Sequence, residues 1–180
     1  MKNIPNLLLI AGTGRNTGKT TLACSVIKRF SANSQVIGLK ISPHFHGGTK
    51  SLKTIIANEN FNLYEETSLK SGKDSSLMLK AGATKVYYIE VLDEHLKMAF
   101  EKFVDTLPSK AHIVCESPAL INYVKPGVFF IVDNEKNKNK KANILQWRKA
   151  ADKWIDTGIE DMDSIIEKIN VNENEWKLVD

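Results

Sequence analysis

The residues best suited to chemistry lie near the start of the chain, in residues 6–23, NLLLIAGTGRNTGKTTLA. An apolar run over residues 7–11 has the length of one buried strand, and the positions from Lys19 onward fit an amphipathic helix. The turn between them carries Gly12, Gly14 and Gly18. Glycines let several backbone N–H groups point at one anion, and the positive end of a helix dipole faces the same point. Strand, glycine-rich turn and helix together predict a phosphate-binding loop.

Two residues at the start of the predicted helix have different expected roles. The Lys19 ammonium reaches the β- and γ-phosphates of a nucleotide, and the Thr20 hydroxyl is a ligand for the accompanying Mg²⁺. The residues of this loop expected to contact the nucleotide are Thr13, Gly14, Arg15, Asn16, Thr17, Gly18, Lys19, Thr20 and Thr21.

The loop departs from the usual pattern G-x-x-x-x-G-K-[ST] at one position. The first glycine of that pattern falls on Thr13, with a glycine on either side. The alternative interpretation is an ordinary glycine-rich turn between a strand and a helix. Arg15 also has two interpretations, as a second phosphate-facing cation or as a solvated loop charge.

The composition of the 180 residues fits a single domain over residues 1–180. The net charge is +4 and both signs are spread along the chain, which argues against a nucleic-acid binder and suits an anionic ligand such as a nucleotide. No apolar run approaches the roughly 20 residues of a membrane span. We therefore expect a cytoplasmic protein with no membrane partner. Cys24 and Cys115 form no C-x-x-C pair, which excludes a zinc site built on one.

Strand and helix patterns alternate along the chain, which predicts an α/β fold. We expect a mainly parallel sheet flanked by helices, in a phosphate-loop NTPase architecture. The predicted strands cover residues 7–11, 36–41, 86–91, 112–115, 127–132, 153–155 and 176–179. The predicted helices lie within residues 19–30, 73–83, 93–106, 144–149 and 161–169. Residues 62–67 are a weaker strand candidate, residues 51–56 fit either a helix or a strand, and the basic run over residues 134–141 fits a solvated loop.

Sheets of this class bind ligands beyond the carboxyl ends of their strands, so acidic residues at those ends are site candidates. Glu116 directly follows the apolar run HIVC, where a carboxylate holds Mg²⁺ together with Thr20 or polarises the attacking water. Asp74, in GKDSS, is a comparable candidate. Lys19, Glu116 and Asp74 form the expected catalytic set. The alternatives are a surface charge for Glu116 and a helix cap for Asp74.

Lys40 lies near the carboxyl end of the second predicted strand, and His44 and His46 follow it closely. We expect all three to face a phosphate or a substrate. The alternative is a surface loop with two solvated histidines. A metal site on this His-x-His pair is disfavoured, because such sites recruit three or four ligands and the sequence offers no others.

Four stretches carry a family resemblance: IAGTGRNTGKTTLA, VIGLKISPHFH, GKDSSLMLKAGA and HIVCES. In this order they resemble the MobB family, the small phosphate-loop proteins of molybdopterin-guanine dinucleotide biosynthesis. The resemblance implies a GTP-binding fold that forms a homodimer and acts beside the enzyme joining GMP to molybdopterin. The chain departs from the family at Thr13, at Ser42 and Pro43 before the histidines, and at Ser117, where the family usually has glycine.

Three functions follow from these observations. The first is a GTP-binding, weakly GTP-hydrolysing accessory protein of molybdenum cofactor biosynthesis, whose partner is a molybdopterin-guanylyltransferase or a molybdoenzyme. The second is an ATP-dependent small-molecule kinase or a dethiobiotin-synthetase-like ligase, since TGRNTGKT resembles the loop T-G-x-x-x-G-K-T of such ligases. The third is a non-catalytic nucleotide-binding module. The chain has no N-K-x-D motif to read guanine, so GTP and ATP both stay open.

Overall fold

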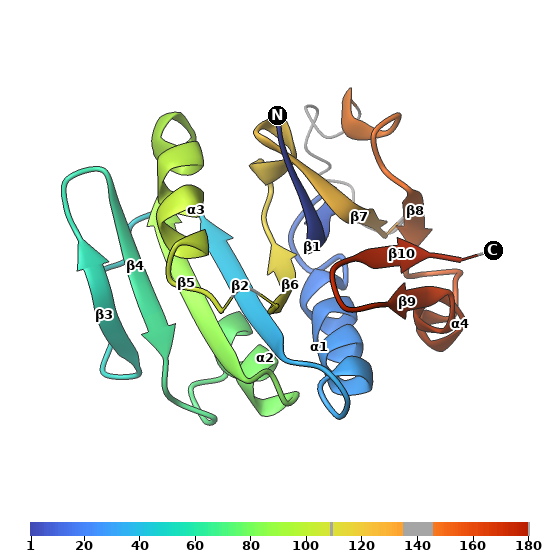
Figure 1. Cartoon of the computed structure of the whole chain (residues 1–180), viewed down its shortest axis with the longest axis horizontal. Helices are drawn as coiled ribbons and strands as arrows, with labels where there is room; N and C mark the ends of the chain where they lie inside the picture. Colours follow the sequence, from blue (N-terminus) through green and yellow to red (C-terminus); the bar gives the residue numbers. More distant parts are fainter. Residues whose placement is uncertain (109, 135–145, 180) are drawn as a thin grey trace.

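The computed structural model describes residues 1–108, 110–134 and 146–179, and eight strands within them form one central sheet (Figure 1). The strand order across the sheet is β3-β4-β5-β2-β6-β1-β7-β8. The strands are β1 (Lys2–Gly12), β2 (Val36–Ser42), β3 (Leu52–Ala57), β4 (Phe61–Glu66), β5 (Lys85–Val91), β6 (His112–Glu116), β7 (Val124–Asp133) and β8 (Lys153–Asp156).

The sheet is mixed and mostly parallel. β1 pairs in parallel with β6 and β7, β2 pairs in parallel with β5 and β6, and β8 continues in parallel from β7. The β3–β4 hairpin adds to the edge beside β5, with both pairings antiparallel. The expected α/β fold with a mainly parallel sheet is therefore confirmed, and of the two alternatives for residues 51–56 the strand is correct, since β3 begins at Leu52.

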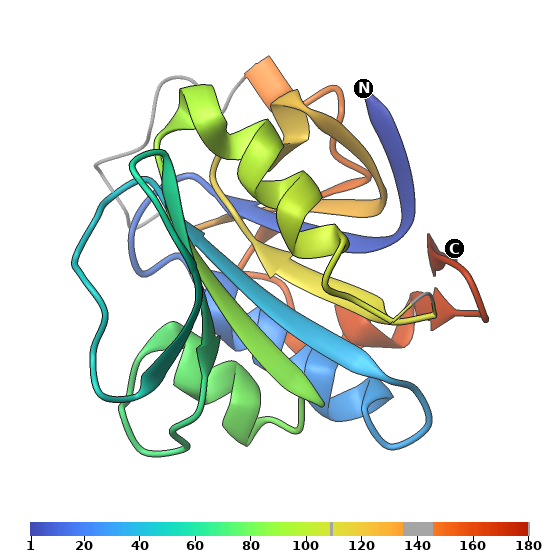
Figure 2. The ribbon, with the colours of Figure 1, turned by 60° about the vertical axis from the view of Figure 1, so that its left-hand side comes forward.

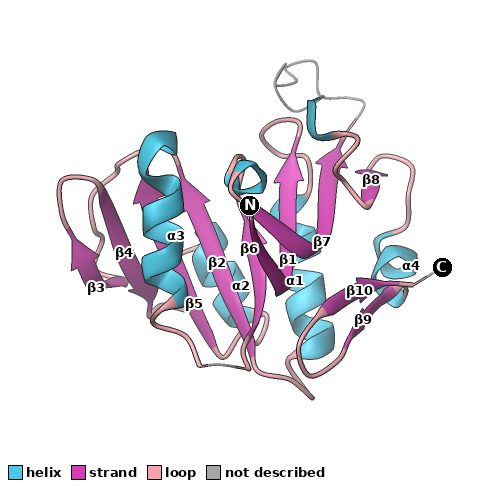
Figure 3. Cartoon of the chain, turned by 45° about the horizontal axis from the view of Figure 1, so that its top comes forward, coloured by secondary structure: helices cyan, strands magenta, loops and turns pink. Residues whose placement is uncertain are grey.

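Helices cover both faces of this sheet (Figures 2 and 3). The α-helices are α1 (Lys19–Phe30), α2 (Asp74–Lys80), α3 (Leu96–Val104) and α4 (Met162–Glu167). α1, α2 and α4 pack with one core cluster and α3 with the other. In β1, Leu7 and Leu9 face the α3 side, whereas Leu8 and Ile10 face the α1 side. A strand covered on both faces is apolar at every position, which explains the unbroken apolar run after Asn6.

The first helix has the predicted bounds. Its buried residues, Leu22, Ala23, Val26 and Ile27, recur at the spacing of one helical face and pack against the sheet. Lys28 and Arg29 lie in its last turn, where positive charge is favourable to the helix dipole. α1 thus presents its amino end to the loop that follows β1.

The carboxyl-terminal region differs from the prediction of a helix over residues 161–169. α4 ends at Glu167, and Ile169 begins a short strand, β9 (Ile169–Val171). β9 pairs antiparallel with β10 (Trp176–Leu178) in a separate two-stranded sheet, which Figure 3 shows apart from the main one. The side chain of Asn172 accepts hydrogen bonds from the backbone N–H groups of Asn174 and Glu175 and closes the turn between these strands. The predicted strand over residues 176–179 is confirmed as β10, whereas Ile169 was assigned to the helix because it continues the helical spacing of Ile165 and Ile166.

Two further boundaries differ. The predicted helix over residues 93–106 is a 3₁₀ turn, Asp93–His95, followed by α3. The predicted helix over residues 144–149 and the basic run over residues 134–141 lie partly outside the described residues. Within residues 1–108, 110–134 and 146–179, no helix combines the length and the apolar character needed to cross a bilayer.

Candidate functional site

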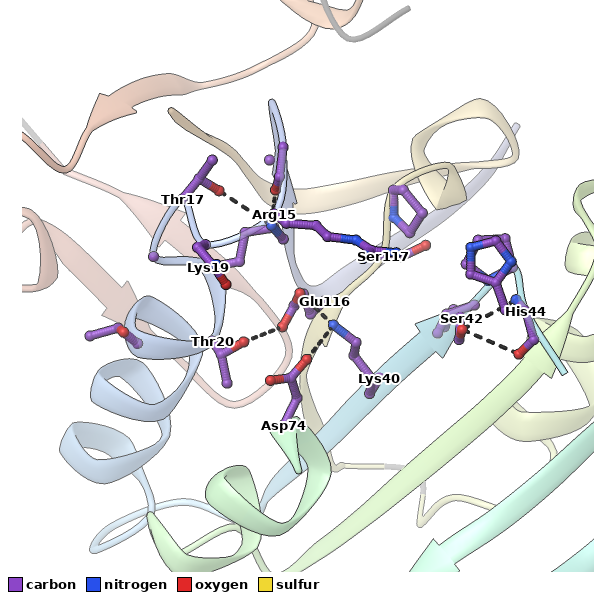
Figure 4. A pocket seen from close by; sticks show the side chains of 18 residues that line it. Arg15, Thr17, Lys19, Thr20, Lys40, Ser42, His44, Asp74, Glu116 and Ser117 are labelled. Atoms are coloured by element: carbon purple, nitrogen blue, oxygen red, sulfur yellow. Dashed lines mark hydrogen bonds and ion pairs between the residues drawn. The ribbon is translucent and has the colours of Figure 1, made fainter. Parts of the chain in front are cut away.

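A pocket of about 600 Å³ opens at the carboxyl ends of β1, β2 and β6, beside the first turn of α2 (Figure 4). Parallel pairing places these strand ends at the same edge: Ile10 lies opposite Glu116, and Glu116 lies opposite Lys40. The lining residues are Gly12, Gly14, Arg15, Asn16, Thr17, Gly18, Lys19, Thr20, Thr21, Lys40, Ile41, Ser42, Pro43, His44, Asp74, Glu116, Ser117 and Pro118.

The loop between β1 and α1 depends on two glycines. Gly18, directly before α1, has a left-handed φ of 95°, and a Cβ there would lie 2.9 Å from the Thr157 methyl carbon. At Gly12 a Cβ would lie 2.5 Å from Cδ of Lys19. Glycine at these positions lets the chain turn sharply and lets the Lys19 side chain lie back across the loop.

The Lys19 side chain folds over the loop rather than extending away from it. Its Nζ donates to the Gly14 carbonyl at 2.6 Å and to the Thr17 hydroxyl at 3.2 Å. The ammonium is therefore held against the loop itself, beside Gly14 and Thr17. A polyanion in the pocket would meet this charge together with the amino end of α1.

Thr13 has a different place from its neighbours in the loop. Its side chain is fully buried, and its hydroxyl donates to Oδ1 of Asp133, at the end of β7, at 2.5 Å. Its backbone N–H donates to the Val132 carbonyl. Thr13 thus fastens the loop to β7 and does not line the pocket. This contact gives a physical reason for threonine at the position where the usual pattern has glycine.

Two residues that were not predicted as part of the site, Asp133 and Thr157, support the loop from behind. Thr157, directly after β8, has its hydroxyl 3.0 Å from the Thr17 carbonyl and 3.1 Å from the Asp133 carbonyl, and it donates to these oxygens. Asp133 ends β7 and Thr157 follows β8, and both strands lie on the far side of β1 from Glu116. The rule about carboxyl ends would have found them, had it been applied to every predicted strand.

Four polar residues converge on the floor of the pocket; we call Thr20, Lys40, Asp74 and Glu116 the floor cluster. The Lys40 ammonium lies 2.5 Å from Oε1 of Glu116 and 2.8 Å from Oδ2 of Asp74. The Thr20 hydroxyl donates to Oε2 of Glu116 at 2.9 Å. Figure 4 shows these side chains pointing toward one another from α1, β2, α2 and β6.

The electrostatics of the floor cluster keep Lys40 and Asp74 charged at neutral pH. Burial favours neutral Asp74, but the Lys40 ammonium outweighs it and holds the pKa of Asp74 below its usual value. Burial likewise favours neutral Lys40, but Glu116 and Asp74 outweigh it and raise the pKa of Lys40. Burial, reinforced by the same two carboxylates, raises the pKa of Cys24 to about 11, so that thiol is protonated at neutral pH.

Asp74 does not cap α2 with its side chain, which corrects the capping interpretation. It is the first residue of the helix, the N-cap position belongs to Lys73, and no side-chain cap is formed there. The Asp74 carboxylate is instead paired with Lys40 across the pocket. The helix dipole still favours a negative charge in this first turn.

The two histidines differ in their position relative to the pocket. His44 lines the pocket, and its backbone N–H donates to the Ser42 hydroxyl at 3.2 Å. His46 lies outside the lining, and its backbone N–H donates to the buried carboxylate of Glu90 at 2.9 Å. The rings are 6.0 Å apart and both residues are exposed. Lys40 and His44 therefore share the pocket with the loop, whereas the His46 backbone fastens the segment to β5.

The donor set of the floor cluster suits Mg²⁺. A hydroxyl and two carboxylates offer hard oxygen atoms, and Mg²⁺ in proteins commonly takes one or two carboxylates and completes its shell with phosphates and waters. In the part of the chain that the structure describes, no three His, Cys, Asp or Glu side chains form a metal-binding group by themselves. Thr20, Glu116 and Asp74 would accordingly hold a metal that shares its coordination with a bound phosphate.

Comparison with known proteins adds nothing to these geometric observations, since no family model, no curated protein and no solved structure matches the chain.

Proposed function

We propose that this protein binds a nucleoside triphosphate with Mg²⁺ through the loop between β1 and α1, in the manner of a phosphate-loop NTPase. One observation carries the proposal: the Lys19 ammonium folds over a glycine-rich turn, and the neighbouring elements place the buried carboxylate of Glu116 and the partly exposed carboxylate of Asp74 beside it. A polyphosphate needs donors along its length and a metal site at its end, and both lie around the same pocket.

The amino end of α1 supports the phosphate part of the proposal. Gly18 brings no side chain to cap the first N–H groups, and the first turn contains no acidic residue. The positive end of the helix dipole thus faces the pocket without a side-chain cap or an acidic residue in the first turn. Lys19 adds a full positive charge at the same place.

The floor cluster supports the metal and the hydrolysis parts. Thr20 and Glu116 already share a hydrogen bond, so a cation between the hydroxyl and the carboxylate would need little rearrangement of either. Mg²⁺ there would neutralise charge on the terminal phosphates. Glu116, which is 3% exposed, would position or polarise a water for slow hydrolysis, and Asp74 would assist from α2.

The more specific role is that of a GTP-binding accessory protein in molybdenum cofactor biosynthesis, acting as a homodimer beside a molybdopterin-guanylyltransferase or a molybdoenzyme. The four stretches that resemble the MobB family support it, because each contributes to the pocket. They supply the loop, Lys40 with His44, Asp74 and Glu116. This role rests on the resemblance, whereas triphosphate binding rests on the geometry.

A second candidate is an ATP-dependent small-molecule kinase or ligase of the dethiobiotin-synthetase kind. The pocket continues past Lys40 to Ser42, Pro43 and His44 on one side and to Ser117 and Pro118 on the other. This space lies beyond the loop, where the terminal phosphate would point, so an acceptor molecule would fit beside it. The accessory-protein role needs no such acceptor.

Equilibrium titration with GTP, ATP, GDP and GMP, each with and without Mg²⁺, tests triphosphate binding. The expected result is affinity that rises with the number of phosphates and tightens with Mg²⁺ for the triphosphates. Equal affinity for GMP and GTP, or no binding of either triphosphate, would contradict the proposal. Phosphate release with GTP alone favours the accessory protein, whereas release only after an acceptor is added favours the kinase or ligase.

A further inference from the structure

The floor cluster already contains a cation, the Lys40 ammonium. It lies between two carboxylates from different elements, Glu116 at the end of β6 and Asp74 at the start of α2, at 2.5 Å and 2.8 Å. The Lys40 side chain is 19% exposed and that of Glu116 is 3% exposed, so this contact is sheltered from solvent. The Asp74 side chain is 42% exposed, so Glu116 is the carboxylate whose burial requires a positive charge close to it.

Lys19 has its hydrogen bonds on the other half of the pocket. Its Nζ lies on the loop, bonded to the Gly14 carbonyl and the Thr17 hydroxyl. It lowers the pKa of Asp74 less than Lys40 does, which agrees with a more remote position. The two lysines are thus divided between the two halves of the pocket, Lys19 on the phosphate half and Lys40 on the carboxylate half.

An ammonium and a Mg²⁺ ion exclude each other at this point. Mg²⁺ binds oxygen ligands at about 2.0–2.1 Å, so a metal bound directly to Oε1 of Glu116 and Oδ2 of Asp74 would overlap the ammonium, which lies 2.5 Å and 2.8 Å from these two oxygens. Charge leads to the same conclusion. Two carboxylates and one ammonium leave a single negative charge, and Mg²⁺ in place of the ammonium leaves none.

We propose that Lys40 is a built-in counter-cation that competes with Mg²⁺ for Asp74 and Glu116, so that the metal binds as the Lys40 ammonium leaves. The inference rests on the proposed function, because it concerns the metal of that nucleotide site. Without a ligand, Lys40 compensates one of the two negative charges and keeps the divalent-metal affinity low. A triphosphate that arrives with Mg²⁺ contributes metal ligands of its own and offers the displaced ammonium an anionic partner.

Lys40 also lies close to the outer part of the pocket along β2. Lys40 lies two residues before Ser42, and Ser42 is hydrogen-bonded to the backbone of His44. A movement of the Lys40 side chain therefore takes place beside the segment that lines the outer part of the pocket.

Calorimetric titration of the nucleotide-free protein with MgCl₂ tests the competition directly. The variant Lys40→Met removes the ammonium and keeps the length of the side chain. Lys28→Met is the matched control, because this exposed lysine on α1 carries the same charge outside the floor cluster. Lys40→Met should bind Mg²⁺ on the order of tenfold or more tightly than the wild type, since an opposing charge at close range is worth more than this in affinity. Lys28→Met should stay within about twofold, because exposed charges at a distance are screened.

Circular dichroism and thermal unfolding establish that the variant is folded. Where Lys40→Met does not fold, Lys40→Gln replaces it, since its neutral amide still donates to the carboxylates. Unchanged or weaker Mg²⁺ affinity in the folded neutral variant would overturn the proposal. The same holds if Lys28→Met tightens Mg²⁺ binding as much as the Lys40 variant does.

A second measurement uses the wild type and separates this inference from the proposed function. The hydrogen-bonded Lys40 ammonium should give a protected lysine ¹⁵N resonance that is missing in Lys40→Met. This resonance should disappear as Mg²⁺ binds and survive KCl of equal ionic strength, and its persistence in the metal-bound protein would overturn the exchange. Both experiments omit nucleotide. A protein that passes them and binds no triphosphate refutes the proposed function alone, and one that binds triphosphate and fails them refutes the exchange alone.

Discussion

Thr20 joins the two halves of the pocket, because it lies in the first turn of α1 and its hydroxyl donates to Glu116 on β6. Thr20→Ala should weaken triphosphate binding about tenfold when Mg²⁺ is present and much less when it is absent, since one metal ligand is lost. Titrations with Mg²⁺ and with EDTA measure both quantities. Thr20→Ser keeps the hydroxyl and should restore the Mg²⁺-dependent affinity. Equal losses with and without the metal would remove Thr20 from the metal site.

Glu116 has the chemistry for hydrolysis, and Glu116→Gln preserves its shape while deleting its charge. We expect the variant to hydrolyse GTP about a hundredfold more slowly than the wild type at saturating nucleotide, with a much smaller change in affinity. Single-turnover phosphate release and a parallel binding titration separate the two effects. Unchanged turnover would leave Glu116 as a counter-charge for Lys40 and nothing more.

At the scale of single residues, the sequence indicated pocket residues wherever a residue follows an apolar strand or a glycine-rich turn. Lys40 and Glu116 were found in this way, and the structure places them opposite each other on neighbouring strands. Asp74 was found as well, but its pairing with Lys40 was not, because aspartate at a helix start equally fits a cap. The contact of Thr13 with Asp133 joins residues 120 positions apart, and no local pattern reveals it.

Among the elements, the turn after β8 supports the loop after β1 through the Thr157 hydroxyl. Thr157→Val keeps the shape and removes this support, so triphosphate affinity should fall several-fold and the free energy of unfolding by about 1 kcal/mol. Thr106→Val is the matched control. The Thr106 hydroxyl donates at 2.6 Å to the carbonyl of Phe103, a residue of α3. The control should lose similar stability and keep its affinity. Equal affinities for both variants would show that the turn does not shape the loop.

The same turn has a pH-dependent contact at Glu160. Burial favours the neutral acid, but the Lys153 ammonium at 2.6 Å and the Asp156 backbone N–H at 3.0 Å outweigh it and lower the pKa of Glu160. A carboxyl whose pKa is lowered by folding stabilises the protein above its unfolded pKa, and the contribution is lost as pH falls through the folded pKa. Glu160→Gln should therefore be less stable than the wild type at about pH 7, and the difference should shrink toward about pH 3.

Urea unfolding at several pH values measures this difference. The exposed Glu173, whose carboxylate lies 3.9 Å from the Lys110 ammonium, provides the comparison Glu173→Gln. This control should change stability little at any pH, because exposed ion pairs contribute little. A Glu160→Gln deficit that stays constant down to about pH 3 would show that its origin is not the charge.

Element prediction succeeded where the apolar pattern of an element is its own and failed where it continues that of a neighbour. α1 was predicted with its observed bounds, because its buried positions repeat at the helical period. β9 was missed because its first residue, Ile169, continues the helical spacing of Ile165 and Ile166, and its pairing with β10 defines it as a strand. β1 begins earlier than predicted, at Lys2, and passes through Pro5 with a shift in register toward β7. A proline inside a strand masks it in a pattern search.

For the whole molecule, the class of fold was predictable and the order of the strands was not. Alternating strand and helix patterns indicate a mainly parallel sheet, but they do not say that β6 lies between β1 and β2. This insertion brings Glu116 between the loop and Lys40. Long-range packing decides the order of the strands, since each central strand is apolar on both faces and has no local preference for a neighbour.

The measurement that tests the central claim most directly is the calorimetric affinity of Lys19→Ala for GTP and Mg²⁺ beside that of Lys28→Ala. Both variants lose one positive charge from α1, but Lys19 lies over the glycine-rich turn and Lys28 lies exposed in the last turn. The account predicts that Lys19→Ala loses about tenfold to a hundredfold in affinity with its fold intact, because charge-assisted hydrogen bonds to phosphate are lost, and that Lys28→Ala matches the wild type. Equal affinities for the wild type and Lys19→Ala would contradict the assignment of this loop to phosphate binding.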